Sequence, residues 1–273
     1  MPMGAITFDI SLAFYFCAML FALLDLSRST KILPRLMLMS AYLGFGFHTI
    51  YIFYSGFSAG HVPFVNPHQA TSFFAWCMFL LFFVLEYRYK LGLLGSFITP
   101  FAFAFMFISF LLPAGMSPLP PILRSQWLGV HTIFAFLANA AFAMAAGVGV
   151  MYLVQEHYVK SKNLGGLFAR LPSLHVLDEI NYRLITIGFP MFTVAIISGS
   201  IWADDAWGSY ISWEPRQVWA IISWLIFGIV LHARFLAGWR GRRAALLTIL
   251  GFLTIIGAFA GLALLHKGQH VFL

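Results

Sequence analysis

The chain is a succession of long apolar segments separated by short polar ones. Each apolar segment is continuous and lacks the alternation of polar and apolar positions that marks a half-buried strand. A segment of roughly 20 apolar residues is long enough for a helix to cross the hydrocarbon core of a bilayer. The pattern therefore predicts an all-α polytopic membrane protein, with residues 1–273 as one transmembrane domain. We expect eight helices, over residues 5–25, 36–57, 69–87, 91–112, 127–154, 184–203, 217–237 and 244–265.

The composition supports a location inside the bilayer. Hydrophobic residues make up 61% of the chain and charged residues only 9%, whereas an ordinary soluble domain carries about 25% charged residues. This excludes a soluble enzyme, and the continuous apolar segments exclude a β-barrel, which needs alternating strands of about 10 residues. The net charge of +7 comes from basic residues in short loops, where they indicate orientation. We expect the lipid bilayer as a partner and no nucleic acid.

The basic residues are distributed unequally between the two sets of loops. One set holds only Arg124, Arg216 and Lys267. The other set is expected to be cytoplasmic, because loops rich in Lys and Arg stay inside. This predicts both termini outside, a cytoplasmic loop over 155–183 and an outer loop over 204–216. The thirteen basic residues of the cytoplasmic set are Arg28, Lys31, Arg35, Arg88, Lys90, Lys160, Lys162, Arg170, Arg183, Arg234, Arg240, Arg242 and Arg243.

Within the cytoplasmic loop, residues 171–183 have the composition of a helix lying at the membrane surface. Ser173 and Asp178 are the residue types that cap a helix N-terminus, so either is a candidate cap. The loop is too short for a separate domain. Chemistry is therefore expected in the membrane or on its outer face.

The outer loop is rich in tryptophan. Trp207, Trp213 and Trp219 lie in it or beside it, with Tyr210 between the first two. One interpretation is an aromatic belt, because Trp and Tyr favour the membrane interface. The other is a flat, polarisable surface for a large planar ligand, since indole rings offer wide faces and N–H donors.

Histidines point to the kind of ligand. His131 opens the fifth span and His270 follows the eighth, so the predicted topology puts both on the side of the tryptophan loop. Neutral imidazole is a good axial ligand for haem iron, and two such residues beside an indole surface predict a bis-histidine haem site. His266 is an alternative to His270, four residues earlier on what is expected to be the same helix face.

Two more histidines lie within spans, where an ionisable residue suggests function. His48 and His232 differ by about 10 Å in predicted depth, counting about 1.5 Å per residue in a core about 30 Å thick. A second haem between them is therefore a hypothesis. His68 falls in the predicted outer loop after the second span, and His175 in the cytoplasmic loop.

Several segments together resemble one family. The segment WGSYISWEPRQVW, residues 207–219, is similar to the tryptophan-rich (WWD-type) signature of the CcsA/ResC proteins of cytochrome c biogenesis, including their HemX-like branch. Residues 231–234 (LHAR), 127–131 (WLGVH) and 268–270 (GQH) resemble further segments of that family. The resemblance extends over nearly the whole chain.

The resemblance implies a haem-handling protein of the cell inner (plasma) membrane. It would transport haem b across the membrane and present it, reduced, for covalent attachment to apocytochrome c, with a CcsB/ResB-type membrane protein as partner. His131 and His270 would ligate the outer haem, and His232 the haem within the membrane, where His48 is a candidate second ligand. Arg216 would pair with a haem propionate, unless it pairs with Glu214 or a lipid phosphate. The resemblance implies no catalytic nucleophile, because such a protein supplies position and electrostatics.

Two alternatives follow from where the sequence departs from the family. Glu214 stands where the signature more often has Asp, and His68 and Gln69 stand where synthetases often have an acidic residue. A HemX-like regulator of haem synthesis without lyase activity is therefore the main alternative. A small-solute permease is a third, but paired broken helices and repeated halves are not seen in the sequence.

Overall fold

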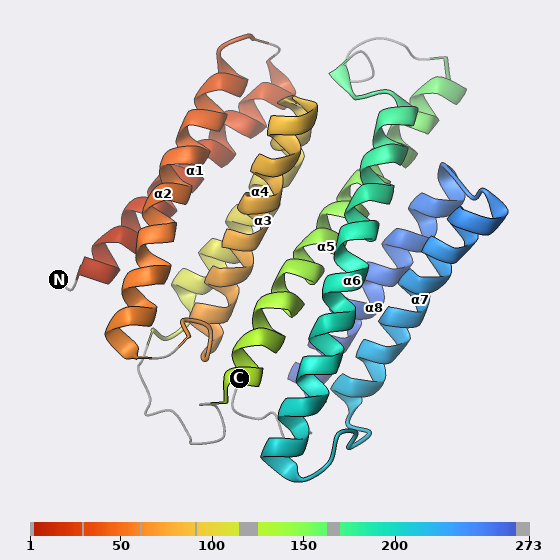
Figure 1. Cartoon of the computed structure of the whole chain (residues 1–273). Coiled ribbons are helices and arrows are strands. Elements are labelled where there is room, and N and C mark those ends of the chain that lie inside the picture. Colours follow the sequence, from red (N-terminus) through yellow and green to blue (C-terminus); the bar gives the residue numbers. More distant parts are fainter. Residues whose placement is uncertain are drawn as a thin grey trace. The chain divides into compact units, whose positions relative to one another are not determined.

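A computed structural model describes residues 3–28, 30–60, 62–90, 92–114, 125–162 and 170–265. These residues form eight α-helices and no strand, which confirms the all-α prediction. By its contacts the chain divides into two compact units, Met1–Pro118 and Leu119–Leu273. The helices are α1 (Met3–Ser27), α2 (Leu33–Ala59), α3 (Pro67–Tyr89), α4 (Gly92–Leu111), α5 (Gln126–Lys160), α6 (Leu174–Trp207), α7 (Pro215–Ala237) and α8 (Arg242–Leu265) (Figure 1).

Most of these helices have the length and composition of membrane spans. Within the described residues, α1, α2, α3, α5, α6 and α7 are long and apolar enough to cross a bilayer. In α4 the apolar stretch is shorter, Gly95–Leu111. The chain is therefore a multi-pass membrane protein, as the hydropathy pattern predicts.

The first unit is a bundle of α1–α4 in which α1 packs against both α2 and α4, and α3 packs against α4. Its core is aromatic: Tyr15 stacks on Phe79 with ring centroids 3.9 Å apart. A Cβ at Gly44 would lie 2.7 Å from the Tyr15 ring, so the lack of a side chain there lets α1 and α2 approach closely. The bundle therefore buries a tyrosine hydroxyl in its interior, beside polar groups described below.

The second unit contains α5–α8, with α5 packed against α6 and α8, and α7 packed against α8. Residues 138–146 of α5 are mostly buried alanines, which allow the α6 backbone to come close. Phe142 of α5 stacks on Phe227 of α7, with centroids 3.7 Å apart and planes within 6°. It also lies over Gly188, where a Cβ would be 2.8 Å from the ring. One phenylalanine thus joins three helices.

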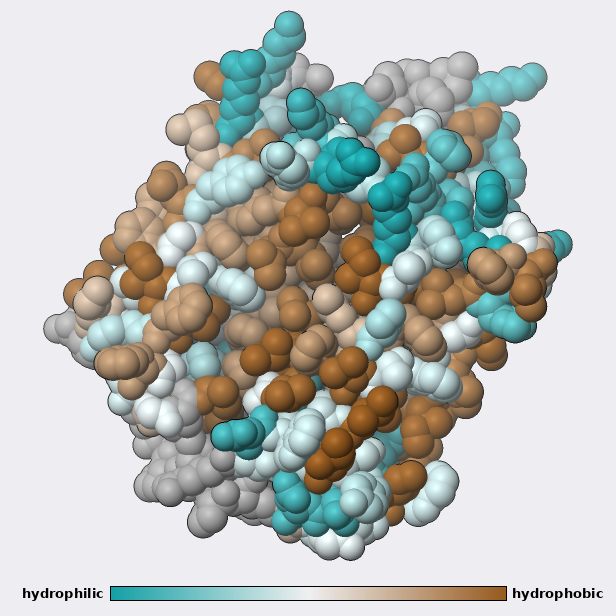
Figure 2. Space-filling view, in the orientation of Figure 1, coloured by the Kyte–Doolittle hydropathy of each residue, from teal (hydrophilic) through white to brown (hydrophobic). Residues whose placement is uncertain are grey.

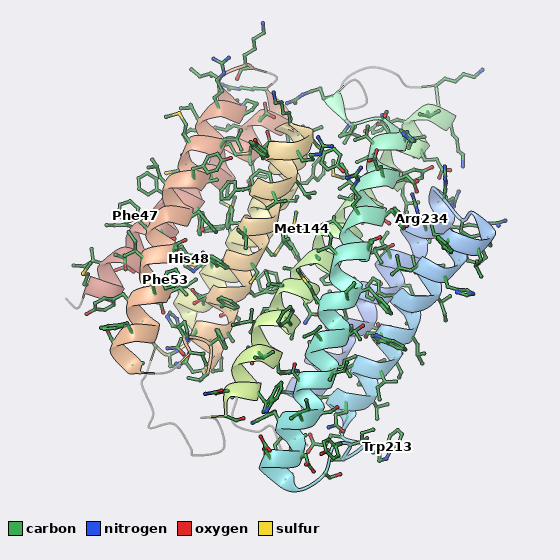
Figure 3. The ribbon with its side chains drawn as sticks, in the orientation of Figure 1. Phe47, His48, Phe53, Met144, Trp213 and Arg234 are labelled. Carbon is green, nitrogen blue, oxygen red and sulfur yellow. The ribbon has the colours of Figure 1, made fainter. Side chains whose placement is uncertain are left out.

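The two ends of the second unit differ in chemistry. One, called the tryptophan end, carries the start of α5 and the α6–α7 connection; the other, the arginine end, carries the start of α6 and the α7–α8 turn. Figure 3 shows Trp213 and Arg234 at these opposite ends. In Figure 2, hydrophilic residues of this unit gather at the arginine end and hydrophobic residues over the middle of its helices. This is the distribution expected of helices that cross a bilayer.

Two helices extend further than the hydropathy pattern predicts. α6 begins at Leu174, and the Ser173 hydroxyl caps it by accepting a hydrogen bond from the amide of Val176. Ser173 is therefore the cap, and Asp178 lies inside the helix. α5 continues to Lys160 and α6 to Trp207, so both ends of the predicted 155–183 loop and the start of the predicted 204–216 loop are helical. The hydropathy pattern detects only the apolar part of a helix that faces lipid. The polar turns at the ends of α5 and α6 lie beyond that part, so the pattern does not include them.

Candidate functional site at the tryptophan end

His131 lies in the second turn of α5 and points at α6. Its Nδ1 is 2.7 Å from the carbonyl oxygen of Ala195. A carbonyl only accepts hydrogen bonds, so Nδ1 carries the proton and donates, and the lone pair is on Nε2. A histidine that ligates iron commonly has its other ring nitrogen fixed in this way by a backbone carbonyl. The contact therefore sets both the tautomer and the orientation of the ring.

Gly199 makes this contact possible. It follows Ala195 by one helical turn, and a Cβ built on it would lie 2.5 Å from Nδ1 of His131. No real side chain tolerates that distance, so any residue other than glycine would push the imidazole away from α6. In the sequence this position is a glycine between two serines, and nothing there predicts that a histidine packs against it.

The α6–α7 connection is held by hydrogen bonds. Gly208 ends α6 in the left-handed conformation, with φ 72°. The amide of Ser212 donates to the side-chain oxygen of Gln217, at 2.8 Å, and the Ser209 hydroxyl donates to the carbonyl of Ile211, at 2.9 Å. α7 then begins with Pro215 as its first residue, where proline is well suited. The short connection is therefore fixed at both of its ends.

The aromatic residues of this end fall into two groups. Trp202 is buried and meets Trp207 edge to face, with centroids 5.0 Å apart; this pair anchors the end of α6. Three others face outward: Trp213 is 72% exposed, Tyr210 58% and Trp219 38%. An aromatic belt explains exposed tryptophans at helix ends, and both interpretations of the loop fit these exposures.

Trp213 differs from its neighbours in its backbone. It has φ 53°, a left-handed conformation that is rare for a bulky residue and costs about 1 kcal/mol or more. Figure 3 shows its side chain projecting from the connection, away from the helices. Strained, exposed residues of this kind cluster at ligand-binding positions, which favours the ligand surface over a plain aromatic belt.

Charged groups border the aromatic surface. Glu214 is the N-cap residue of α7 and is buried. It interacts electrostatically with Arg216, which is about half-buried. A hydrogen bond to the Asp204 carboxylate raises the pKa of Tyr210 above its usual value, because the phenol donates its proton to that carboxylate. The surface therefore combines exposed rings with one cation.

His131 and the aromatic surface are joined by a single helix. Gly199, which receives the imidazole, precedes Gly208 by nine residues of α6, or about 13 Å at about 1.5 Å per residue. The structure thus brings Trp207, Tyr210, Trp213 and Trp219 to the same end of the second unit as His131.

The other predicted ligands lie elsewhere. His48 is fully buried in the first unit, with Nδ1 3.3 Å from the Tyr15 hydroxyl and Nε2 2.8 Å from the Ser72 hydroxyl. His232 is exposed on α7 of the second unit. His270 and its alternative His266 lie outside the described residues. In the part of the chain that is described, no three His, Cys, Asp or Glu side chains gather as a metal site.

His68 is a residue whose surroundings the sequence does not predict. It lies in the first turn of α3, buried, and not in a loop. Its Nδ1 is 2.7 Å from the carbonyl of Ser109 and its Nε2 2.9 Å from the Tyr51 hydroxyl. The signal for an earlier helix start was present, since Asn66 and Pro67 are a typical cap and first residue.

The comparisons with known proteins agree with this fold. The family described as "Cytochrome C assembly protein" matches residues 64–270. The chain is 34% identical to cytochrome c biogenesis protein CcsA of Synechococcus sp. (strain CC9605) over 269 residues, which cover 89% of this chain and 88% of that protein. It is 32% identical to CcsA of Mesostigma viride over 238 residues, 78% of each chain.

A solved structure shares the arrangement of the helices. "Cytochrome c Heme Lyase CcmF" superposes with a TM-score of 0.70 over 94% of this chain, at 15% identity. The match covers 46% of that protein, so this chain spans less than half of its length, and the likeness shows the fold alone. The family match, by contrast, covers well over half of the chain, and the relatives exceed 30% identity. The chain therefore belongs to the cytochrome c assembly protein family, together with the CcsA proteins.

Proposed function

We propose that this protein acts in cytochrome c biogenesis by carrying haem across the membrane and presenting it, reduced, at the tryptophan end for attachment to apocytochrome c. The observation that carries the proposal is the His131 imidazole, held by the Ala195 carbonyl in the tautomer that ligates iron. It lies at the same end of the unit as a strained, exposed Trp213. The names of the relatives, CcsA and a haem lyase, support the same role.

Each residue of this end has a proposed task. His131 and His270 would hold the haem iron through their imidazole nitrogens. The exposed rings of Trp213, Trp219 and Tyr210 stack on the porphyrin face and exclude water from it. Arg216 pairs with a propionate, with Glu214 fixing its position. Trp207 anchors the loop through its contact with Trp202.

Haem b supplies the vinyl groups to which the two cysteine thiols of apocytochrome c add. The contribution of this chain is orientation, because a fixed edge of the porphyrin must face the incoming thiols. No residue is proposed as a nucleophile. A CcsB/ResB-type membrane protein is the proposed partner, and the tryptophan end is proposed to face outward from the plasma membrane, since Lys and Arg gather at the opposite end.

The first test is an absorption spectrum of the detergent-purified protein, oxidised and dithionite-reduced. Low-spin haem with sharp reduced α and β bands is expected. His270→Ala is expected to weaken the bands and His266→Ala to leave them, because only His270 is proposed as a ligand. Colourless protein from cells that make ample haem would favour the HemX-like regulator, and bands lost only with His266→Ala would move the ligand to that residue.

A second haem within the membrane is proposed at His232 of the second unit, and His48 of the first unit is kept as a separate candidate ligand. Ligation by His48 requires it to release Tyr15 or Ser72, since these hydroxyls engage its two nitrogens. We expect His232→Gln and His48→Gln each to lower the haem content by up to one equivalent per chain, measured by pyridine haemochrome assay. Unchanged haem in His48→Gln, with less in His232→Gln, would make His48 a structural residue.

The strain at Trp213 gives a test that separates binding from folding. Trp213→Gly relieves the strain of the left-handed backbone. The free energy of unfolding of the haem-free protein is therefore expected to stay the same or to rise by up to about 1 kcal/mol. Haem affinity is expected to fall about fivefold or more, because one stacked ring is lost, worth about 1 kcal/mol. Trp127→Gly, which removes an exposed tryptophan of α5 at the same end, is the matched control. An unchanged affinity in Trp213→Gly would remove this ring from the proposed site.

A further inference from the structure

The arginine end of the second unit holds a pocket of about 460 Å³ between the start of α6 and the α7–α8 turn. It lies at the opposite end of the unit from His131 and the tryptophan loop. His175 and Asp178 of α6, Arg234 and Phe235 of α7, and Arg240 of the turn are among its lining residues. The pocket therefore mixes charged side chains with an aromatic one.

Both carboxylates of this pocket are already neutralised. Asp178 accepts two hydrogen bonds from Arg234, at 2.9 and 2.7 Å, and a third from the amide of Gly241, at 2.7 Å. Glu179 accepts from Arg183 one turn further along α6, at 2.6 Å. Each acidic group thus has its own arginine, and neither attracts a further cation.

Arg240 is the surplus charge. It is exposed and interacts electrostatically with Asp178. Among the described residues, no carboxylate lies within ion-pair distance of its guanidinium. The guanidinium carbon of Arg234 lies 4.3 Å from the centroid of the Tyr182 ring. Two of the five N–H donors of this guanidinium bind Asp178. With His175 also exposed in the lining, the pocket is suited to an anionic oxygen-bearing group, such as a phosphate.

The apolar side of the pocket indicates the source of that phosphate. Phe235 is 81% exposed and Leu236 66% exposed, next to Arg234 on a helix apolar enough to span a bilayer. Such side chains face acyl chains in a membrane, directly beside the cations. A free phosphate would use only the charged half of the pocket, whereas a phospholipid uses both. We propose that this pocket binds the headgroup phosphate of an anionic phospholipid, with its acyl chain along Phe235.

The test is native mass spectrometry of the detergent-purified full chain, supplied with phosphatidylglycerol or phosphatidylcholine. We expect retained phosphatidylglycerol, and a loss of about fivefold in its affinity in Arg240→Gln, the value of one arginine near an anionic headgroup. Arg243→Gln is the matched control, because it removes the same charge from the start of α8 without lining the pocket. Both arginines are exposed, so both variants are expected to fold, which thermal unfolding checks.

Each other result overturns the proposal in its own way. Equal retention of the two lipids shows that the pocket does not read headgroup charge. Equal losses in Arg240→Gln and Arg243→Gln show a diffuse basic surface in place of a pocket. Displacement of the lipid by inorganic phosphate at similar concentration shows a site for soluble phosphate. None of these three outcomes affects the haem spectrum. A negative result for lipid binding is therefore distinguishable from a negative result for the proposed function.

Discussion

Replacing His131 by alanine is expected to remove the low-spin haem bands of the tryptophan end. The imidazole is the only described histidine at that end, and its proton is already committed to the Ala195 carbonyl. Loss of a group that merely orients a metal ligand costs about 10–100-fold in affinity, so loss of the ligand itself is expected to cost at least about 100-fold. The measurement is haem titration of the purified variant, followed by the reduced absorption spectrum.

Rescue distinguishes a ligand from a packing residue. In His131→Gly, added imidazole can occupy the space left by the side chain, and we expect the reduced bands to return. If imidazole restores nothing although the variant melts like the unaltered protein, His131 is not an iron ligand. The same titration on His175→Gly, a histidine at the arginine end, controls for general effects of losing an imidazole.

Gly199 tests the geometry without touching the ligand. Gly199→Ala would place a methyl group 2.5 Å from Nδ1 of His131, breaking the hydrogen bond to Ala195, and haem affinity is expected to fall by about 10-fold or more. Gly147→Ala on α5 is the matched change, because a Cβ there meets nothing within 4 Å. Equal affinities in the two variants would show that the position of the imidazole does not matter.

The fold was predictable because hydropathy and local caps are properties of short segments. Eight apolar stretches predict the eight helices found in the described residues. Ser173 was one of two candidate caps, with Asp178, and the structure selects it. The positions of the helix ends were harder to predict from the sequence. The sequence predicts residues 171–183 as a helix at the membrane surface, separate from the span that begins at 184. In the structure, α6 runs without a break from Leu174, because backbone hydrogen bonds continue from the Ser173 cap into the apolar region.

The residue types of the candidate site are visible in the sequence, whereas their arrangement in space is not. Tryptophans, histidines and Arg216 predict a ligand by their chemistry, and their role as a binding site stays a prediction. The position of the His131 ring depends on Ala195 and Gly199, which lie more than sixty residues later in the chain. Only the packing of α5 against α6 brings these residues together. The left-handed backbone at Trp213 has no signal either, because its type argues against that conformation.

The part-buried ion pair at the arginine end shows the same limit and carries the largest expected effect on stability. Asp178 and Arg234 are only 12% and 11% exposed, and two hydrogen bonds join them in a parallel fork. The two residues are 56 positions apart in the sequence, so no local pattern predicts that they pair. Arg234→Leu leaves the Asp178 carboxylate with one hydrogen bond, from the Gly241 amide, and with the more distant charge of Arg240. Removing one partner of a fully buried pair costs about 3–5 kcal/mol, and this part-buried pair is expected to fall at or below the lower end of that range.

We therefore expect Arg234→Leu to lower the free energy of unfolding in detergent by up to about 3 kcal/mol. Arg183→Leu breaks an exposed pair on α6, with side chains 50% and 36% exposed, and is expected to cost only about 0.5 kcal/mol. Arg234→Lys is expected to resemble Arg234→Leu more than the unaltered protein, because an ammonium cannot reproduce the fork. Adding Asp178→Asn to Arg234→Leu removes the stranded charge and should recover most of the loss. A double variant no more stable than Arg234→Leu would mean that the arginine acts through Tyr182, which its guanidinium covers, and not through the carboxylate.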